Sequence, residues 1–505
     1  MPRTATLPLG AVPAGRGRTH FGVWAPDAGA VAVRSGGEDR ALERGEDGFW
    51  SGELPVAAGE DYLFVLDGGD AWPDPMSRRQ PDGVRGRSRV DDASAFEIAP
   101  GPSLSLDDLV LYELHVGTFS PEGTFDGVIP RLRALRELGV TAIELMPVAT
   151  FPGERGWGYD GLYTSAPHEA YGGPDGLARL VDAAHREGLG VFLDVVYNHV
   201  GPGNEALRAF GPYFTERHGQ TPWGDAIDYD QRGVREWAIQ NAELWIRDYR
   251  IDGLRLDAVH AVVDESHPHV LAELAERVRA VEPSAFVVSE MGPADFRPLE
   301  VWDHDAMWLD NLHHALHVAL TGEQDGYYAE FDGSMESIAK ELRRPQGAQI
   351  VAAAQNHDQV GNRAIGDRLP DAKRRVASAV VLFSTFTPLL FQGEEYGERA
   401  PFQFFTDHID PFIADATREG RRREFRHFAG FQGEVPDPQD PATFERSKLT
   451  PAEPEPLYRE LLALRRTLPL ELEVDADEAA RTLTLRRGEA TLHVDFRNET
   501  VEVET

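Results

Sequence analysis

The chain has 505 residues, of which 41% are hydrophobic and 27% are charged, a balance typical of a globular protein in water. Its formal net charge of −35 argues against a nucleic-acid partner, because an acidic surface repels phosphates, and suits a neutral or cationic substrate. The absence of cysteine excludes disulfides, thiolate metal sites and cysteine nucleophiles.

The length predicts roughly three domains. No apolar run reaches the roughly 18 residues that a membrane span needs, so we expect no membrane partner. The first 22 residues lack the continuous apolar segment of a secretory signal, so the expected location is cytoplasmic.

Residues 1–98 predict an N-terminal β-sandwich similar to a carbohydrate-binding module. Between residues 19 and 98, strand-like runs such as "THFGVWAP" and "DYLFVLDGG" alternate with turns rich in glycine, proline and aspartate. Separate glucan binding by this domain is one alternative. The preferred interpretation is that its aromatic residues form its own core, namely Phe21, Trp24, Trp50, Tyr62 and Phe64.

Residues 99–470 alternate between strand and helix patterns, which predicts an α/β fold. The eight strand candidates are 109–117, 141–148, 190–198, 253–259, 285–290, 306–311, 350–357 and 388–395. Amphipathic helical stretches separate them. Eight such units without a G-x-G-x-x-G turn favour a (β/α)8 TIM barrel over a doubly wound sheet. Residues 471–505 return to short strands and predict a short C-terminal β-domain.

Polar residues gather where the predicted barrel strands end. Arg255 and Asp257 are two residues apart in one apolar strand, so their side chains share a face as a structural ion pair or as the edge of an active site. In a TIM barrel the active site lies at the C-terminal ends of the strands. The other residues at these ends are Asp194, Asn198, His199, His260, Glu290, His357 and Asp358.

Each of these residues alone has an ordinary structural explanation, but together they favour glycoside cleavage. That reaction needs one carboxylate to attack or stabilise an oxocarbenium-like centre and one carboxylic acid to protonate the leaving oxygen. Arg255 would keep Asp257 ionised and oriented. Aromatic residues near the strand ends are either core residues or platforms for sugar rings: Trp157, Tyr159, Tyr197 and Trp223.

Four stretches resemble, in order, the motifs of the α-amylase superfamily of glycoside hydrolases: "DVVYNHVG" (194–201), "GLRLDAVH" (253–260), "SE" (289–290) and "NHDQ" (356–359). The resemblance implies a retaining mechanism, with Asp257 as nucleophile, Glu290 as general acid/base and Asp358 as the third carboxylate. It also implies further roles around sugar subsite −1. These are positioning of the nucleophile by Arg255, hydroxyl binding by His199 and His357, and stacking by Tyr159.

Within that superfamily the chain resembles the maltooligosyltrehalose trehalohydrolase family, notably in "FQGEEYGERAPFQFFTDHIDP" (391–411). This resemblance implies cleavage of the α-1,4 bond next to the terminal trehalosyl unit of a maltooligosyl trehalose, with release of trehalose. The stretch "EMGPADFRP" (290–298) departs from the pattern expected after the acid and affects the contacts at subsite +1. Further candidates for substrate contact are Asp160, Trp223, His260 and Glu394, the last two with a supporting structural role as an equal alternative.

Three alternatives fit the same motifs. A glycogen branching enzyme shares the sandwich and barrel but would form new α-1,6 linkages, and a broader α-amylase would digest plain maltooligosaccharides. A barrel that only binds carbohydrate would usually lack one of the three carboxylates. Many amylases bind calcium near the first motif, but no dense ring of acids surrounds Asn198, so we predict neither a metal nor another cofactor. The oligomeric state is open.

Overall fold

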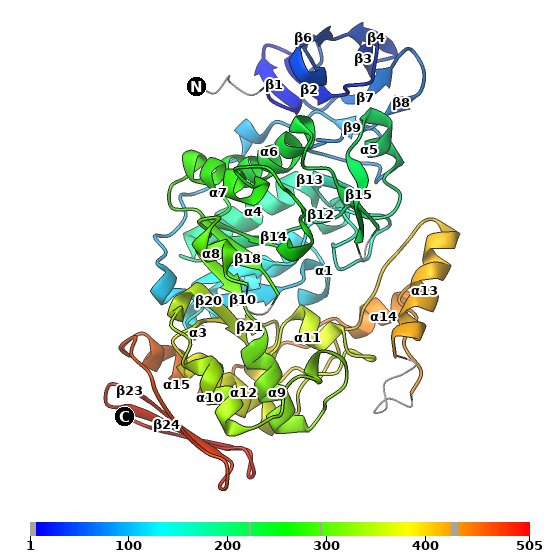
Figure 1. Cartoon of the computed structure of the whole chain (residues 1–505). Coiled ribbons are helices and arrows are strands. Elements are labelled where there is room, and N and C mark those ends of the chain that lie inside the picture. The colour runs from blue at the N-terminus through cyan, green and yellow to red at the C-terminus, as the bar shows by residue number, and fades with distance from the viewer. Residues whose placement is uncertain (1–6, 222–223, 293–294, 426–432) are drawn as a thin grey trace.

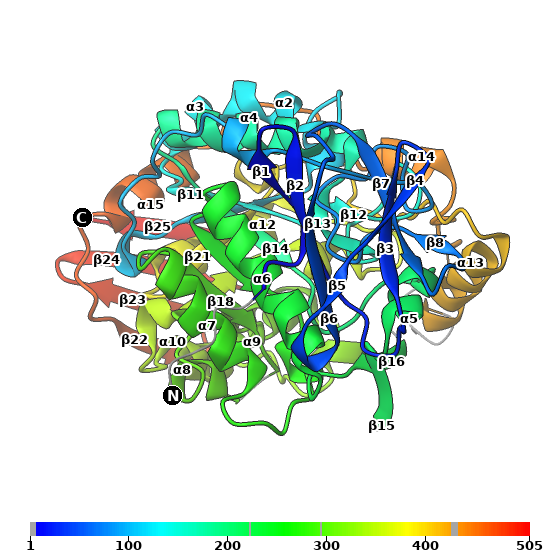
Figure 2. The same cartoon turned by 90° about the horizontal axis from the view of Figure 1, so that it is seen from above.

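The computed structural model describes residues 7–221, 224–292, 295–425 and 433–505 (Figure 1). The N-terminal sheets lie above the central barrel in Figure 1 and in front of it in Figure 2. The C-terminal sheet lies at the left of the barrel in both views. Among the described residues, no helix is both long and apolar enough to cross a membrane.

Two antiparallel sheets form the N-terminal part. The first has the order β1 (Gly10–Gly15), β2 (Arg18–Trp24), β6 (Phe49–Leu54) and β5 (Glu43–Arg44). The second has the order β4 (Glu38–Ala41), β3 (Val31–Ser35), β7 (Asp61–Leu66) and β8 (Ala71–Trp72), and β9 (Ser88–Arg89) pairs with β7. All five aromatic residues predicted for the core are at most 5% exposed, so that prediction is confirmed.

Eight parallel strands close into a barrel in chain order, which confirms the predicted fold class. They are β10 (Leu111–Leu114), β11 (Ala142–Leu145), β14 (Gly190–Val195), β17 (Gly253–Leu256), β18 (Phe286–Glu290), β19 (Ala306–Trp308), β20 (Ile350–Ala353) and β21 (Thr387–Phe391). Both faces of most strands are buried, as expected for a parallel sheet covered by helices. Several strands end earlier than predicted, and polar residues such as Asp257 and His357 lie in the connections that follow them.

Amphipathic helices surround the barrel (Figure 2). Among them are α3 (Leu132–Leu138), α4 (Gly173–Arg186), α6 (Arg232–Asp248), α7 (Val270–Val281), α9 (Asn311–Thr321), α10 (Met335–Leu342) and α12 (Asp371–Phe383). In α4, buried Leu177, Leu180, Val181 and Ala184 follow the i, i+3, i+4, i+7 spacing of one helix face. That apolar face packs against the barrel and leaves the polar face in solvent.

The C-terminal sheet is antiparallel and has the order β22 (Glu473–Asp477), β23 (Thr482–Arg487), β24 (Ala490–Asp495) and β25 (Thr500–Glu504). Arg487 joins it to the barrel, since Nη1 donates to the carbonyl oxygens of Phe383 and Ser384 at the end of α12, at 3.2 and 2.8 Å. The predicted domain boundaries at residues 98/99 and 470/471 stay predictions.

Candidate active site

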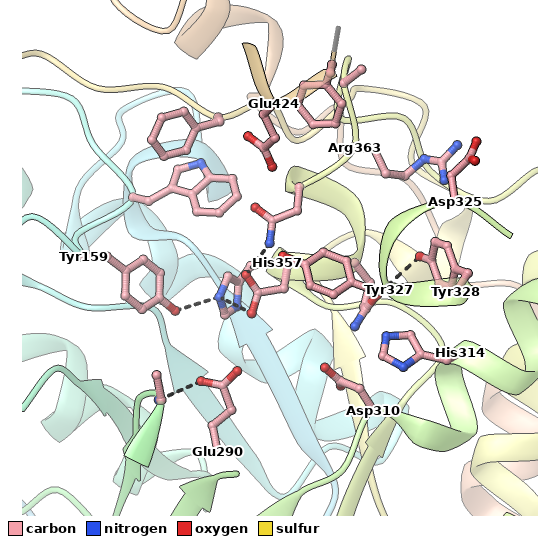
Figure 3. Close-up of a pocket in the computed structure, with 18 of the residues that line it drawn as sticks. Tyr159, Glu290, Asp310, His314, Asp325, Tyr327, Tyr328, His357, Arg363 and Glu424 are labelled. Carbon is pink, nitrogen blue, oxygen red and sulfur yellow. Dashed lines mark hydrogen bonds and ion pairs between the residues drawn. The ribbon is translucent and has the colours of Figure 1, made fainter. Parts of the chain in front are cut away.

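A cavity of about 1080 Å³ lies at the C-terminal ends of the barrel strands (Figure 3). Its lining includes residues that follow β17 and β20 and the last residue of β18. Eight of the residues singled out from the sequence line it: Trp157, Tyr159, His199, Asp257, His260, Glu290, His357 and Asp358.

Arg255 lies fully buried in β17 beside this cavity and contacts three carboxylates. Its Nη1 donates to Asp194 Oδ2 at 2.6 Å and to Asp257 Oδ1 at 2.8 Å. Its Nη2 is 2.9 Å from Glu290 Oε2. Burial opposes the charge, but Asp194 and Glu290 hold the pKa of Arg255 well above its usual value. Arg255 and Asp257 are therefore an ion pair, and Asp257 is the member of the pair that lines the cavity.

Asp257 is held through both of its carboxylate oxygens. While Oδ1 accepts from Arg255, Oδ2 accepts from Asn198 Nδ2 at 2.7 Å, and the same amide donates to the Asp257 carbonyl oxygen at 2.8 Å. The next residue, Ala258, has φ of +40°, a left-handed conformation that is uncommon for alanine. In this turn the Ala258 N–H donates to Glu290 Oε2 at 2.8 Å. The carboxylate of Glu290 is therefore held by the residue that directly follows Asp257.

Glu290 ends β18 and leaves 23% of its side chain exposed in the cavity. Its Oε2 meets both the Ala258 N–H and Arg255, whereas the other oxygen points into the cavity (Figure 3). Within the described chain, no hydrogen bond occupies that second oxygen. One oxygen is thus fixed and the other is available to a ligand.

The "NHDQ" stretch begins helix α11 (His357–Gly361). His357 Nε2 lies 3.3 Å from Asp358 Oδ2, and the other oxygen of Asp358 accepts from Asn362 Nδ2 at 2.9 Å. On the opposite side of the ring, Nδ1 lies 2.5 Å from Glu113 Oε1. Burial lowers the pKa of His357, but Asp358 and Glu113 raise it more, and the resulting pKa is about 10.

Tyr159 and His199 complete this wall of the cavity. The Tyr159 ring stacks on His357 with centroids 5.2 Å apart, and its hydroxyl donates to Asp194 Oδ2 at 2.6 Å. His199 Nε2 lies 2.9 Å from the Tyr159 carbonyl oxygen, and burial lowers the pKa of His199. Trp157 also lines the cavity, but it stacks on Phe402 and so also belongs to a buried aromatic cluster.

The remaining predicted contacts are placed differently. Exposed His260 lines the cavity, whereas Asp160 Oδ2 lies 3.6 Å from His408 Nε2 and, in the described structure, outside the cavity lining. The buried carboxylate of Glu394 accepts from Ser378 Oγ at 2.6 Å and is likewise outside the described lining, an arrangement that favours its supporting alternative. Trp223 lies outside the described residues, as do residues 293–294 of the stretch after Glu290.

Several cavity residues were not predicted. Asp310 follows β19 as the other acids follow their strands, so the same strand-end rule identifies it. Burial, helped by the charges of Glu290 and Asp358, raises the pKa of Asp310 to about 7. The outer wall comes from loops and helices whose sequences carry no comparable signal: His314, Asp325, Tyr327, Tyr328, Arg363 and Glu424 (Figure 3). Within the described ranges, no group of three or more His, Cys, Asp or Glu residues is arranged to hold a metal ion.

Comparison with known proteins agrees with this geometry. Residues 72–217 match the family model described as "Alpha amylase, catalytic domain". The chain is 40% identical to the malto-oligosyltrehalose trehalohydrolase of Rhizobium sp. (strain M-11), covering 99% of this chain and 94% of the relative. It is 44% identical to the protein of the same name from Deinococcus radiodurans, covering 93% and 84%. A solved structure from Salmonella typhimurium, provisionally named an alpha amylase, superposes with a TM-score of 0.86 at 38% identity, covering 96% and 92%.

Proposed function

The chain belongs to the malto-oligosyltrehalose trehalohydrolase family, and on this basis we propose that it hydrolyses the α-1,4-glucosidic bond next to the terminal trehalosyl unit of a maltooligosyl trehalose, releasing trehalose. The observation that carries the proposed chemistry is the contact of Asp257 and Glu290 with the two terminal nitrogens of Arg255 at one cavity. A cytoplasmic role in trehalose biosynthesis belongs to the same proposal.

In the first step, an oxygen of Asp257 attacks the anomeric carbon of the glucose at subsite −1. Glu290 gives its proton to the glycosidic oxygen, so that trehalose leaves with a new hydroxyl group. The product of this step is a covalent glycosyl-enzyme ester on Asp257. In the second step, Glu290 takes a proton from water, the resulting hydroxide attacks the same carbon, and Asp257 leaves as a carboxylate.

The surrounding residues hold the reacting groups in place. Arg255 and Asn198 each donate to a different oxygen of Asp257, and this fixes the carboxylate for attack. Asp358 and His357 bind hydroxyl groups of the sugar at subsite −1, and Tyr159 offers the face of its ring. The negative charge of Asp257 stabilises the positive charge that develops on the sugar in the transition state.

Product analysis with two substrates tests the proposed function. Maltotriosyl trehalose and maltopentaose are incubated separately with the enzyme, and the sugars released are identified by chromatography. We expect rapid release of free trehalose from the first substrate and slow attack on the second. Comparable digestion of both would instead indicate an α-amylase specificity, and new α-1,6 linkages in maltopentaose products would indicate a branching enzyme.

A further inference from the structure

Two buried acids lie side by side in the barrel strands that precede the site. Glu113 of β10 and Glu144 of β11 are register partners in the parallel pair, and each is 1% exposed. Fully buried charged residues are rare unless they are paired. The partners of the two acids differ: Glu113 binds His357, whereas both side-chain oxygens of Glu144 lack a hydrogen bond within the described structure.

Glu113 uses both carboxylate oxygens on a single residue. Its Oε1 lies 2.5 Å from His357 Nδ1, and its Oε2 accepts from the His357 backbone N–H at 2.9 Å. His357 is the first residue of α11 and Asp358 is the second. Glu113 therefore fixes the imidazole ring and also the backbone of the helix turn that carries Asp358.

The hydrogen bonds of Tyr159 and Glu113 indicate which nitrogens of the His357 ring carry a hydrogen. The Tyr159 hydroxyl gives its one proton to Asp194 Oδ2, an oxygen that also accepts from Arg255. The tyrosine oxygen can then only accept at its 2.8 Å contact with His357 Nε2, so Nε2 carries a hydrogen. Because Nδ1 faces a carboxylate oxygen of Glu113, it carries a hydrogen as well. The ring is an imidazolium.

We propose that Glu113 is a positioning residue that acts through His357, holding the ring doubly protonated with Nε2–H toward the cavity and fixing the helix turn that presents Asp358. The inference rests on the proposed function, in which His357 and Asp358 bind the sugar at subsite −1. Glu113 itself does not line the cavity in the described structure. It provides the fixed anion that a buried imidazolium requires.

The other charged groups near His357 agree with this arrangement. Burial lowers the pKa of His357 and Arg255 opposes its charge, but Asp358 and Glu113 outweigh both. Burial, with a smaller contribution from the charge of His357, lowers the pKa of His115 to about 4, so His115 is neutral near pH 7. Burial and the charge of Glu113 raise the pKa of Glu144 well above its usual value, so Glu144 is the neutral member of the acid pair. The remaining groups are Tyr159 and Asp194.

A pair of isosteric variants tests the proposal. Glu113→Gln removes the anion, and an amide cannot accept from both the ring N–H and the backbone N–H through its two ends. Glu144→Gln is the matched control, because glutamine has the shape of a neutral carboxylic acid. The protein is labelled with ¹³Cε1-histidine, the His357 resonance is assigned with His357→Gln, and its titration is followed by NMR without substrate.

We expect His357 to stay charged through pH 8 in the wild type and in Glu144→Gln. In Glu113→Gln it should titrate near or below the usual histidine pKa of about 6.5. On maltotriosyl trehalose, kcat/KM of Glu113→Gln should fall about 10- to 100-fold, by analogy with a metal-ligating histidine that loses the partner orienting its ring. The remaining activity should decline as the pH rises through the lowered pKa, a change that loss of stability alone would not produce. Glu113→Asp keeps the anion and should keep the ring charged with part of the activity.

A neutral His357 in the wild type at pH 7 would overturn the proposal without any variant. An unchanged His357 titration in Glu113→Gln, or the larger effect in Glu144→Gln, would also overturn it. If Glu113→Gln does not fold, the wild-type titration and the Glu113→Asp variant still decide the question. Failure of the wild type to release trehalose would refute the proposed function separately, since the titration needs no substrate.

Discussion

Asp257→Asn and Glu290→Gln make the same chemical change but should affect stability differently. Both oxygens of Asp257 accept from N–H donors, on Arg255 at 2.8 Å and on Asn198 at 2.7 Å. An amide NH2 at either position would therefore face another donor. Rotating the Asn198 amide gives no relief, because its oxygen would then face the Asp257 carbonyl. Leaving one buried donor unpaired costs about 1–3 kcal/mol of unfolding free energy.

Glu290→Gln avoids this conflict. The glutamine oxygen can take the place of Oε2, accept from the Ala258 N–H and lie beside Arg255 Nη2, while the NH2 group points into the cavity. The lost ion pair joins the fully buried Arg255 to a Glu290 side chain that is 23% exposed, and Arg255 keeps its hydrogen bonds to Asp194 and Asp257, so we expect this loss to cost less than the donor conflict in Asp257→Asn. Both variants should lose turnover of maltotriosyl trehalose by on the order of 100-fold or more, because each removes a reacting group.

Thermal unfolding of the wild type and both variants in one buffer, with kcat measured in parallel, distinguishes these effects. We expect the unfolding midpoint of Asp257→Asn to be lowered by a few degrees, and that of Glu290→Gln to stay close to the wild type. A wild-type midpoint for Asp257→Asn would refute the donor-conflict argument. A drop for Glu290→Gln as large as that for Asp257→Asn would refute the inference that its second oxygen is free. Wild-type turnover in Asp257→Asn would refute the mechanism itself.

Three further results are expected. Glu290→Gln should form the glycosyl-enzyme readily from a glycosyl fluoride, whose leaving group needs little acid help, but not from maltotriosyl trehalose; equal losses in burst kinetics on both would contradict its role as the acid. Asp310→Asn should raise the thermal midpoint at pH 8 more than at pH 5. Folded Asp310, with a pKa of about 7, keeps a proton that the unfolded chain releases near pH 4, so its presence costs stability as the pH rises between these values; an equal change at both pH values would contradict this sign. Arg487→Ala should expose the C-terminal sheet to limited proteolysis while kcat is retained, because Arg487 joins that sheet to α12 through carbonyl contacts far from the cavity; wild-type protease resistance would contradict that role.

The barrel was predictable because each strand is an apolar run followed by polar residues. β22 was not predicted, because its alternating acidic residues leave only Val474 buried, and pairing with β23 rather than a hydrophobic pattern forms the strand. The hairpin of β15 (Phe214–Thr221) and β16 (Gly224–Ile227) was also missed. It lies in the connection between barrel strands β14 and β17, where the two strands pair with each other and not with the barrel.

Sequence position identified the three carboxylates, because the end of a barrel strand already places a residue at the cavity. The same rule left two roles open for Glu394, which follows β21: contact with trehalose or support of the barrel rim. Gly393 adopts a left-handed φ of +81°, and this turn directs the Glu394 side chain toward Ser378 of α12. Tyr327 and Arg363 reach the cavity from segments outside the strands, so their positions depend on tertiary contacts such as the ion pair of Arg363 with Glu323 at 2.7 Å.

The acids around this cavity differ in their charge state mainly because their hydrogen-bond partners differ, and less because of their burial. Glu113 and Glu144 are equally buried, yet Glu113 faces an imidazolium and Glu144 meets no donor in the described structure. Asp194 is intermediate: Oδ2 accepts from Arg255 and Tyr159, Oδ1 has no partner there, and burial raises its pKa to about 7. Because Arg255 is divided among Asp194, Asp257 and Glu290, it cannot fully neutralise any one of them. Asp257 therefore keeps enough negative charge to attack the sugar, while the shared guanidinium holds its position.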